Sequence, residues 1–156
     1  KGLPGTFHGD LHFENIIYNK SKKEFTFLDW RQDFENNLKV GDIYYDLAKL
    51  MHGIIVNHKH VVNNNFTISW EKNYINFGIS QSKIYKESLQ FYENWIIKNG
   101  YNLSKVRILT SIIFLNIACL HHYPYSLFLF ALGKSMLFNE LIDNNKKTNK
   151  TLLLIN

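Results

Sequence analysis

The sequence predicts an α+β fold that is mostly helical. Three observations predict it: apolar residues at helical spacing through most of the chain after residue 42, short β-type runs before it, and a hydrophobic content of 46%. A length of 156 residues suits one domain with a sizeable core, and no internal repeat or domain break interrupts the chain. We therefore expect one unit over residues 1–156.

The beginning of the chain is expected to be a loop followed by a β-hairpin. Glycines and a proline punctuate residues 1–14, which favours irregular structure. Residues 15–18 and 24–28 are β-type runs, and the polar, lysine-rich segment 19–23 between them is typical of a solvated turn. A hairpin of this kind places the start of its first strand beside the end of its second.

Helical periodicity begins at Asp42, which is also a suitable N-terminal cap. The polar segment 57–65 is expected to be a loop, and 66–70 alternates as a strand that can pair with 74–77. Further helices are expected over about residues 82–98, 104–121 and 126–142. The run 144–150 is predicted to be a polar tail or linker.

Charge and cysteine content exclude several classes of protein. A net charge of +5 is compatible with an anionic ligand, but no cluster of Lys and Arg with interleaved aromatic residues indicates nucleic acid. The single Cys119 lies in an apolar run and is expected to be a buried thiol, so a reducing, cytoplasmic location fits. The apolar stretch 108–120 is shorter than the roughly 20 residues of a membrane span, which predicts a core helix and no membrane span.

One group of polar residues indicates a specific chemistry. Residues 8–15 read HGDLHFEN, with Asp10 five residues before Asn15, and Asp29 ends a later apolar run, FTFLD. Phosphoryl transfer from ATP uses such a set, because one Asp orients and deprotonates the attacking hydroxyl while an Asn and a second Asp hold magnesium. The protein-kinase signature is H-R-D-L-x-x-x-N followed by D-F-G, and here Gly9 replaces the Arg and Trp30 the Phe.

This pattern resembles the aminoglycoside phosphotransferase and choline kinase family, the small-molecule branch of the protein-kinase-like fold. Residues 41–48, GDIYYDLA, resemble that family's G-D-x-x-Y-D-L-A segment. The resemblance implies the C-terminal lobe of a kinase-like fold, with Asp10 as catalytic base. It further implies that Asn15 and Asp29 hold Mg²⁺ on a short β-hairpin, with ATP as phosphoryl donor.

The acceptor implied by the resemblance is a hydroxyl of a small molecule, which we expect to lie against the helices of residues 82–142. Choline, a sugar, an amino alcohol or an aminoglycoside-like compound are all open. A polycationic aminoglycoside usually requires an acidic cleft, and a net charge of +5 argues against it.

Four further residues are expected in supporting roles. His8 should brace the catalytic loop by hydrogen bonds, and His12 either packs the loop or contacts substrate. Asp42 should cap its helix, and Asp46 should anchor backbone or the catalytic loop.

Two other functions remain open from the sequence. One is a non-catalytic, kinase-like binding module. The other is a metallophosphoesterase, because Asp10 to His12 form a D-x-H and Asp42 with Asp46 imitates a downstream G-D-x-x-D. The phosphoesterase also requires an apolar strand before D-x-H and a later N-H-[ED] block, and neither occurs.

The nucleotide-covering part of a kinase has no counterpart in this sequence. Residue 1 lies nine residues before Asp10, and no G-x-G-x-x-G or G-x-x-x-x-G-K-[ST] loop occurs. We therefore expect a fragment of a longer protein, whose N-terminal lobe would be its partner. The isolated fragment should bind nucleotide poorly and show no measurable phosphoryl transfer.

Overall fold

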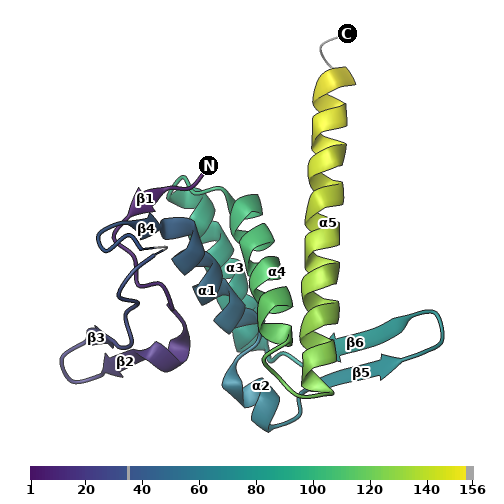
Figure 1. Cartoon of the computed structure of the whole chain (residues 1–156), viewed down its shortest axis with the longest axis horizontal. Coiled ribbons are helices and arrows are strands. Elements are labelled where there is room, and N and C mark those ends of the chain that lie inside the picture. The colour runs from purple at the N-terminus through teal and green to yellow at the C-terminus, as the bar shows by residue number, and fades with distance from the viewer. Residues whose placement is uncertain (35, 154–156) are drawn as a thin grey trace.

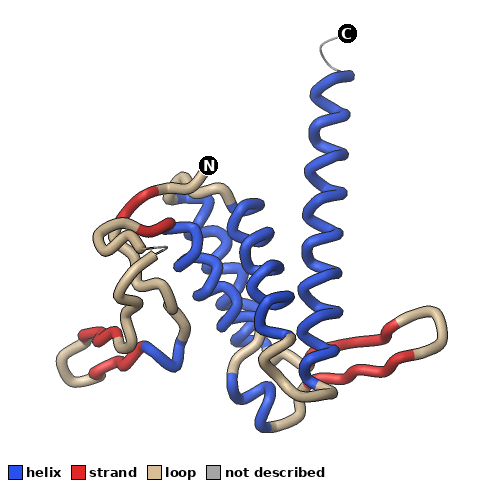
Figure 2. The backbone as a smooth tube through the Cα atoms, in the orientation of Figure 1, coloured by secondary structure: helices blue, strands red, loops and turns tan. Residues whose placement is uncertain are grey.

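The computed structural model describes residues 1–34 and 36–153. Its helices are α1 (Ile43–Ile55), α2 (His58–Val62), α3 (Lys83–Lys98), α4 (Leu103–Ala118) and α5 (Tyr125–Leu153), with a short 3-10 helix η1 (Phe13–Asn15). Its strands are β1 (Pro4–Gly5), β2 (Ile16–Asn19), β3 (Glu24–Phe27), β4 (Gly41–Asp42), β5 (Phe66–Trp70) and β6 (Ile75–Ile79). About half of the chain is helical and the strands are short (Figure 2), so the predicted α+β, mostly helical class is confirmed.

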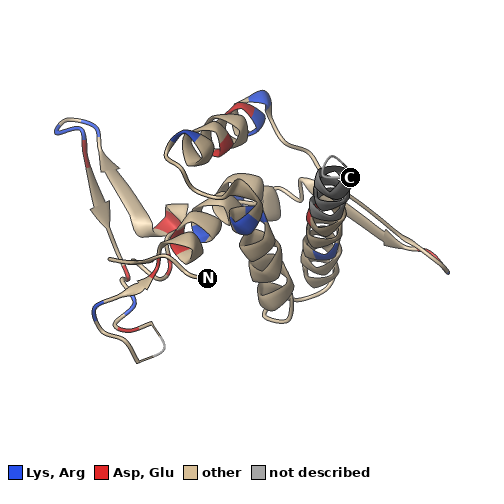
Figure 3. Cartoon of the chain, turned by 90° about the horizontal axis from the view of Figure 1, so that it is seen from above, with Lys and Arg blue, Asp and Glu red and all other residues tan. Residues whose placement is uncertain are grey.

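The strands form three separate antiparallel pairs. The two predicted hairpins are confirmed: β2 pairs with β3, with Ile16 opposite Phe27, and β5 pairs with β6. Lysines mark the tip of the β2–β3 hairpin, away from the helices (Figure 3). The third pair, β1 with β4, sets Pro4 opposite Asp42 and joins the first loop to the start of α1.

The core lies among the long helices, with α4 packed between α1 and α5 (Figure 1). The largest side chains with almost no exposed surface are Phe114, Phe128, Met51, Ile96, Leu129 and Val106. Burying an apolar side chain of this size contributes roughly 1.5–3 kcal/mol. The buried Thr110 hydroxyl donates to the carbonyl oxygen of Val106, and it also lies 3.3 Å from that of Ala48 on α1. These contacts hold α1 against α4, so that α1 can support residues that pack on its other face.

Two segments differ from the sequence prediction. The loop predicted at 57–65 is wrong, because α2 forms inside it: Asn57 and His60 cap each other's backbone amides and stabilise the first turn. The tail predicted at 144–150 is also wrong, since the backbone of α5 continues to Leu153. The sequence after residue 133 contains no Gly or Pro that would end a helix.

The burial predicted for Cys119 is likewise wrong, because its thiol is exposed. Cys119 caps the C-terminal end of α4, where the helix leaves the core, and its Sγ donates to the carbonyl oxygen of Asn116 at 3.0 Å. Within residues 1–34 and 36–153, no helix combines the length and the apolar character needed to cross a membrane.

Candidate active site

The loop that carries Asp10 is held by one buried carboxylate on α1. The backbone N–H groups of His8 and Gly9 donate to the two oxygens of Asp46, at 2.6 and 2.8 Å. Hydrogen bonds to an ionised acceptor are stronger than neutral ones, so this pair fixes the loop firmly on the helix. Gly9 has φ +81°, and a Cβ there would lie 2.5 Å from the side chain of Arg31. A glycine is therefore required where protein kinases carry an Arg.

The side chain of His8, a residue of this loop, packs against the segment that follows β3. Its imidazole is 4% exposed, and its Nδ1 accepts the N–H of Asp10 at 3.2 Å. The ring packs on Trp30, with centroids 4.9 Å apart, and the carbonyl oxygen of His8 accepts the N–H of Arg31. Within the described part of the chain, His8 Nε2 has no hydrogen-bond partner. These contacts are those of a residue that braces the loop.

The carboxylate of Asp10 is surrounded by two cationic side chains and by the imidazole of His12. The nearest is Lys49 on α1, whose Nζ lies 2.7 Å from Oδ1. His12 Nε2 and an Arg31 nitrogen lie 3.6 and 3.8 Å from Oδ2. The sequence patterns did not identify Lys49. A signal was available, because Lys49 follows Asp46 by three residues and therefore shares its helix face.

These cations determine the protonation of Asp10. Partial burial acts to raise the pKa of the carboxyl group, but the hydrogen bond and charge of Lys49, with the charges of His12 and Arg31, outweigh it. The pKa of Asp10 is thereby held below its ordinary value. Asp10 is an ionised carboxylate near neutral pH, which is the form that can accept a proton.

Asn15 lies next to this carboxylate at the end of η1. The side chain is buried, and its Nδ2 donates to the carbonyl oxygen of Asp10 at 3.0 Å. His12 Nε2 lies 3.3 Å from the same nitrogen. Because the amide nitrogen is used in this way, the amide oxygen is the atom that can coordinate a metal ion.

Asp29 lies just beyond the paired part of the hairpin. The N–H of Leu28 donates to the carbonyl oxygen of Asn15 at 2.8 Å, so the residue preceding Asp29 is adjacent to Asn15. Asp29 is exposed and has φ +52°, the left-handed region that few residues other than Gly, Asn and Asp enter. Backbone strain of this kind is found preferentially at functional sites.

The donor types of Asn15 and Asp29 suit magnesium. Mg²⁺ prefers oxygen ligands and is commonly bound by one or two protein groups together with substrate phosphates and water. Within the described residues, no group of three or more His, Cys, Asp and Glu side chains could hold a metal ion. A metal ion at this position would therefore depend on the bound nucleotide for its remaining ligands.

His52 lies one turn along α1 from Lys49 and predicts a pH dependence of stability. Burial, followed by the charge of Lys49, lowers the pKa of His52 to about 4, and its ring packs on Phe114. The unfolded chain binds this proton near its ordinary pKa of about 6.5, while the folded chain does so only near pH 4. Stability is therefore expected to fall by on the order of 3 kcal/mol as pH decreases between these values.

The measurement is the free energy of unfolding against pH. His52→Gln cannot be protonated and should flatten the curve between about pH 6.5 and 4. Equal slopes for the two proteins in this window would contradict the assignment.

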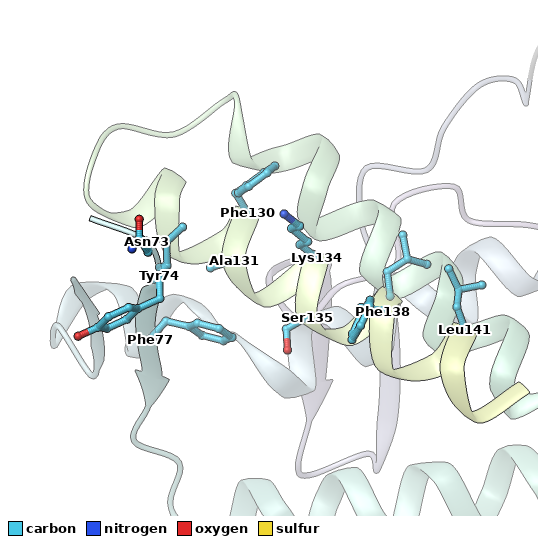
Figure 4. Close-up of a pocket in the computed structure, with 11 residues that line it drawn as sticks. Asn73, Tyr74, Phe77, Phe130, Ala131, Lys134, Ser135, Phe138 and Leu141 are labelled. Atoms are coloured by element: carbon cyan, nitrogen blue, oxygen red, sulfur yellow. The ribbon is translucent and has the colours of Figure 1, made fainter. Parts of the chain in front are cut away.

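The cavities around the molecule differ in their distance from Asp10. Two small ones, of about 220 and 180 Å³, border the catalytic loop at Gly9 and at His8. A third, of about 620 Å³, lies between the β5–β6 hairpin and α5 (Figure 4), on the other side of the helices from the loop (Figure 1). It is lined mainly by apolar side chains such as Phe77 and Phe138, and none of the described residues that line it is an Asp or Glu. Among the cavities described, the two small ones are therefore the ones that lie at the loop of Asp10.

The four aromatic residues that could line a cage for a quaternary ammonium ligand are Tyr44, Tyr45, Trp70 and Trp95. They lie in different places: Tyr44 and Trp95 both pack on Tyr101, Tyr45 packs on Phe34, and Trp70 is on the β5–β6 hairpin. The face of Tyr44 is covered by the Lys105 ammonium, 3.9 Å from the ring centroid. These four rings therefore do not form one cage.

The comparisons with known proteins give one match to a family. Residues 2–77 match the model of the phosphotransferase enzyme family, a range that contains the loop of Asp10, the β2–β3 hairpin and α1. No curated protein and no solved structure matched the chain significantly. Residues 2–77 are therefore similar to the phosphotransferase enzyme family, and the resemblance to aminoglycoside phosphotransferases and choline kinases is confirmed for that segment.

Proposed function

We propose that this chain carries the catalytic residues of an ATP-dependent kinase that phosphorylates a hydroxyl group of a small molecule. The observation that carries the proposal is the ionised carboxylate of Asp10, on a loop fixed to α1, with Asn15 and the end of the hairpin at Asp29 beside it. The family match supports phosphotransferase chemistry at the coarser level.

Asp10 is the group that acts on the acceptor in this proposal. Its carboxylate accepts a hydrogen bond from the acceptor hydroxyl and aims the oxygen at the γ-phosphorus atom of ATP. It takes the proton as the new O–P bond forms, while the bond from the γ-phosphorus to the bridging oxygen breaks and ADP leaves. Asp46 keeps the loop in place during this step through the two backbone hydrogen bonds.

The amide oxygen of Asn15 and the carboxylate of Asp29 are the groups that would hold magnesium. A bound magnesium ion supplies neutralisation of the phosphate charge. The exposed position of Asp29 supports this role, because a metal ligand shared with a nucleotide has to be reachable from solvent.

The acceptor is proposed to be a small alcohol such as choline, a sugar or an amino alcohol. The cavity of about 220 Å³ next to Gly9 is lined by Arg31, Asp33, Phe34 and Tyr45, so it offers charged, hydrogen-bonding and aromatic groups. Its volume suits a compact molecule better than a large polycation.

The test uses the full-length protein with Mg²⁺, ATP and a panel of small alcohols. Asp29→Asn keeps the shape of the side chain but withdraws a charge from the proposed magnesium position. It should raise KM for ATP and lower kcat together. Glu24→Gln removes an equal charge from the exposed far end of the same hairpin and should leave both constants unchanged.

The possible outcomes separate the competing functions. Unchanged kinetics in Asp29→Asn would remove Asp29 from the metal site. Phosphorylation of none of the alcohols by the unmodified protein would favour the non-catalytic binding module. Release of phosphate from a phosphate ester without ATP would favour a phosphoesterase.

A further inference from the structure

One face of α1 follows the catalytic loop along its length. Asp46 holds two backbone amides of the loop, and Lys49, three residues later, contacts the side chain of Asp10. Four residues further, Gly53 faces the ring of Phe13, and a Cβ there would lie 3.2 Å from it. These positions share one helix face. Lys49 therefore reaches Asp10 as part of the surface that supports the whole loop.

The contacts of the Asp10 carboxylate are asymmetric. Oδ1 lies 2.7 Å from the ammonium of Lys49, which is the length of a charge-assisted hydrogen bond. Among the ion pairs of the described residues, Oδ2 is near His12 and Arg31, at 3.6 and 3.8 Å, which is too long for hydrogen bonds. Lys49 thus holds one oxygen, and the other faces the His12 imidazole and the Arg31 guanidinium without a hydrogen bond to either.

The pair formed by Lys49 and Asp10 is shielded from solvent. The side chain of Lys49 is 13% exposed and that of Asp10 is 21% exposed, whereas that of Arg31 is 63% exposed. Charges that are partly buried are screened less by salt than charges on the surface. Among these three contacts, the one from Lys49 is both the shortest and the best protected.

We propose that Lys49 is a positioning residue for Asp10: it holds Oδ1 so that Oδ2 faces the acceptor hydroxyl. This inference rests on the phosphotransferase function proposed above. A carboxylate that is free to rotate would spend part of its time with neither oxygen directed at the hydroxyl, and catalysis is sensitive to misplacement on the scale of 1 Å. Lys49 acts through Asp10 and does not itself contact ATP.

The experiment measures steady-state kinetics of the full-length protein with three variants. Lys49→Met removes the ammonium but keeps much of the apolar stem, and it should lower kcat by roughly 10²-fold while KM for ATP stays unchanged. Lys49→Arg keeps a cation within reach of Oδ1 and should retain a large part of the activity. Lys83→Met is the matched control, because Lys83 is 88% exposed on α3 and pairs only with Glu87 among the ion pairs described.

A double variant shows whether Lys49 acts through Asp10. If it does, Asp10→Asn combined with Lys49→Met should be no slower than Asp10→Asn alone, since the group being positioned is already gone. Losses that multiply would overturn the proposal. So would a normal kcat in Lys49→Met, or a raised KM for ATP with normal kcat, which would make Lys49 a phosphate ligand.

The failure of this inference can be told from failure of the proposed function. If Asp10→Asn is inactive and Lys49→Met is normal, the kinase assignment stands and only the role of Lys49 falls. If Asp10→Asn keeps normal activity, the assignment of the base itself is wrong. Thermal unfolding of the unmodified protein and of the Lys49→Met, Lys49→Arg and Lys83→Met variants completes the test, because a purely structural ion pair would change stability and leave kcat intact.

Discussion

Asp10→Asn is expected to lower kcat of the full-length protein by about 10²–10⁴, the usual contribution of a general base. The substitution preserves the shape of the side chain and removes the proton acceptor. It also leaves Lys49 Nζ beside a neutral amide in place of a carboxylate. KM for ATP should hardly change, because in the proposed mechanism Asp10 contacts the acceptor hydroxyl and not the nucleotide.

Comparison with the neighbouring histidines decides whether Asp10 is the base. His8→Ala should act mainly through stability, because the His8 ring is buried against Trp30 and accepts the backbone N–H of Asp10. His12→Ala should be less severe than Asp10→Asn. Near-normal kcat in Asp10→Asn, together with complete loss in either histidine variant, would move the chemistry to a histidine.

Asp46→Ala is expected to destabilise the protein by roughly 3–6 kcal/mol, because it removes two hydrogen bonds to a charged group and each contributes about 1.5–3 kcal/mol. The substitution leaves the backbone N–H groups of His8 and Gly9 without their acceptor in a buried position. The measurement is the free energy of unfolding from denaturant titration.

Asp46→Asn is the matched control for this prediction. It retains one acceptor oxygen and loses the charge, so an intermediate loss of stability is expected. If Asp46→Ala costs less than about 1 kcal/mol, the typical contribution of one ordinary hydrogen bond, Asp46 does not hold the loop.

The hairpins and most helices could be predicted because their signals are local. The polar turn between β2 and β3 and the capping side chain of Asp42 act within a few residues of the structure they produce. The prediction failed for α2 and for the end of α5, where polar residues were interpreted as a loop and a tail. Polar composition does not prevent a helix when a capping pair starts it or when no breaker ends it.

The candidate site, too, could be predicted from the sequence only in part. Asp10, Asn15 and Asp29 could be named from the sequence because their spacing matches the kinase pattern, which combines one proton acceptor with two magnesium ligands. The spacing does not say what surrounds these side chains. The left-handed backbone of Asp29 and the unpaired Nε2 of His8 within the described chain are properties of the folded loop.

By itself, the sequence determined the fold class, the hairpin that precedes Asp29 and the residue types of the candidate catalytic loop. Only the tertiary structure decided which side chains hold Asp10 and its loop and keep its carboxyl group ionised. Asp46 and Lys49 lie more than thirty residues from the loop in sequence, and they reach it because α1 packs there along one face. Contacts of this kind depend on helix packing around a shared core, which no short-range pattern of residues encodes.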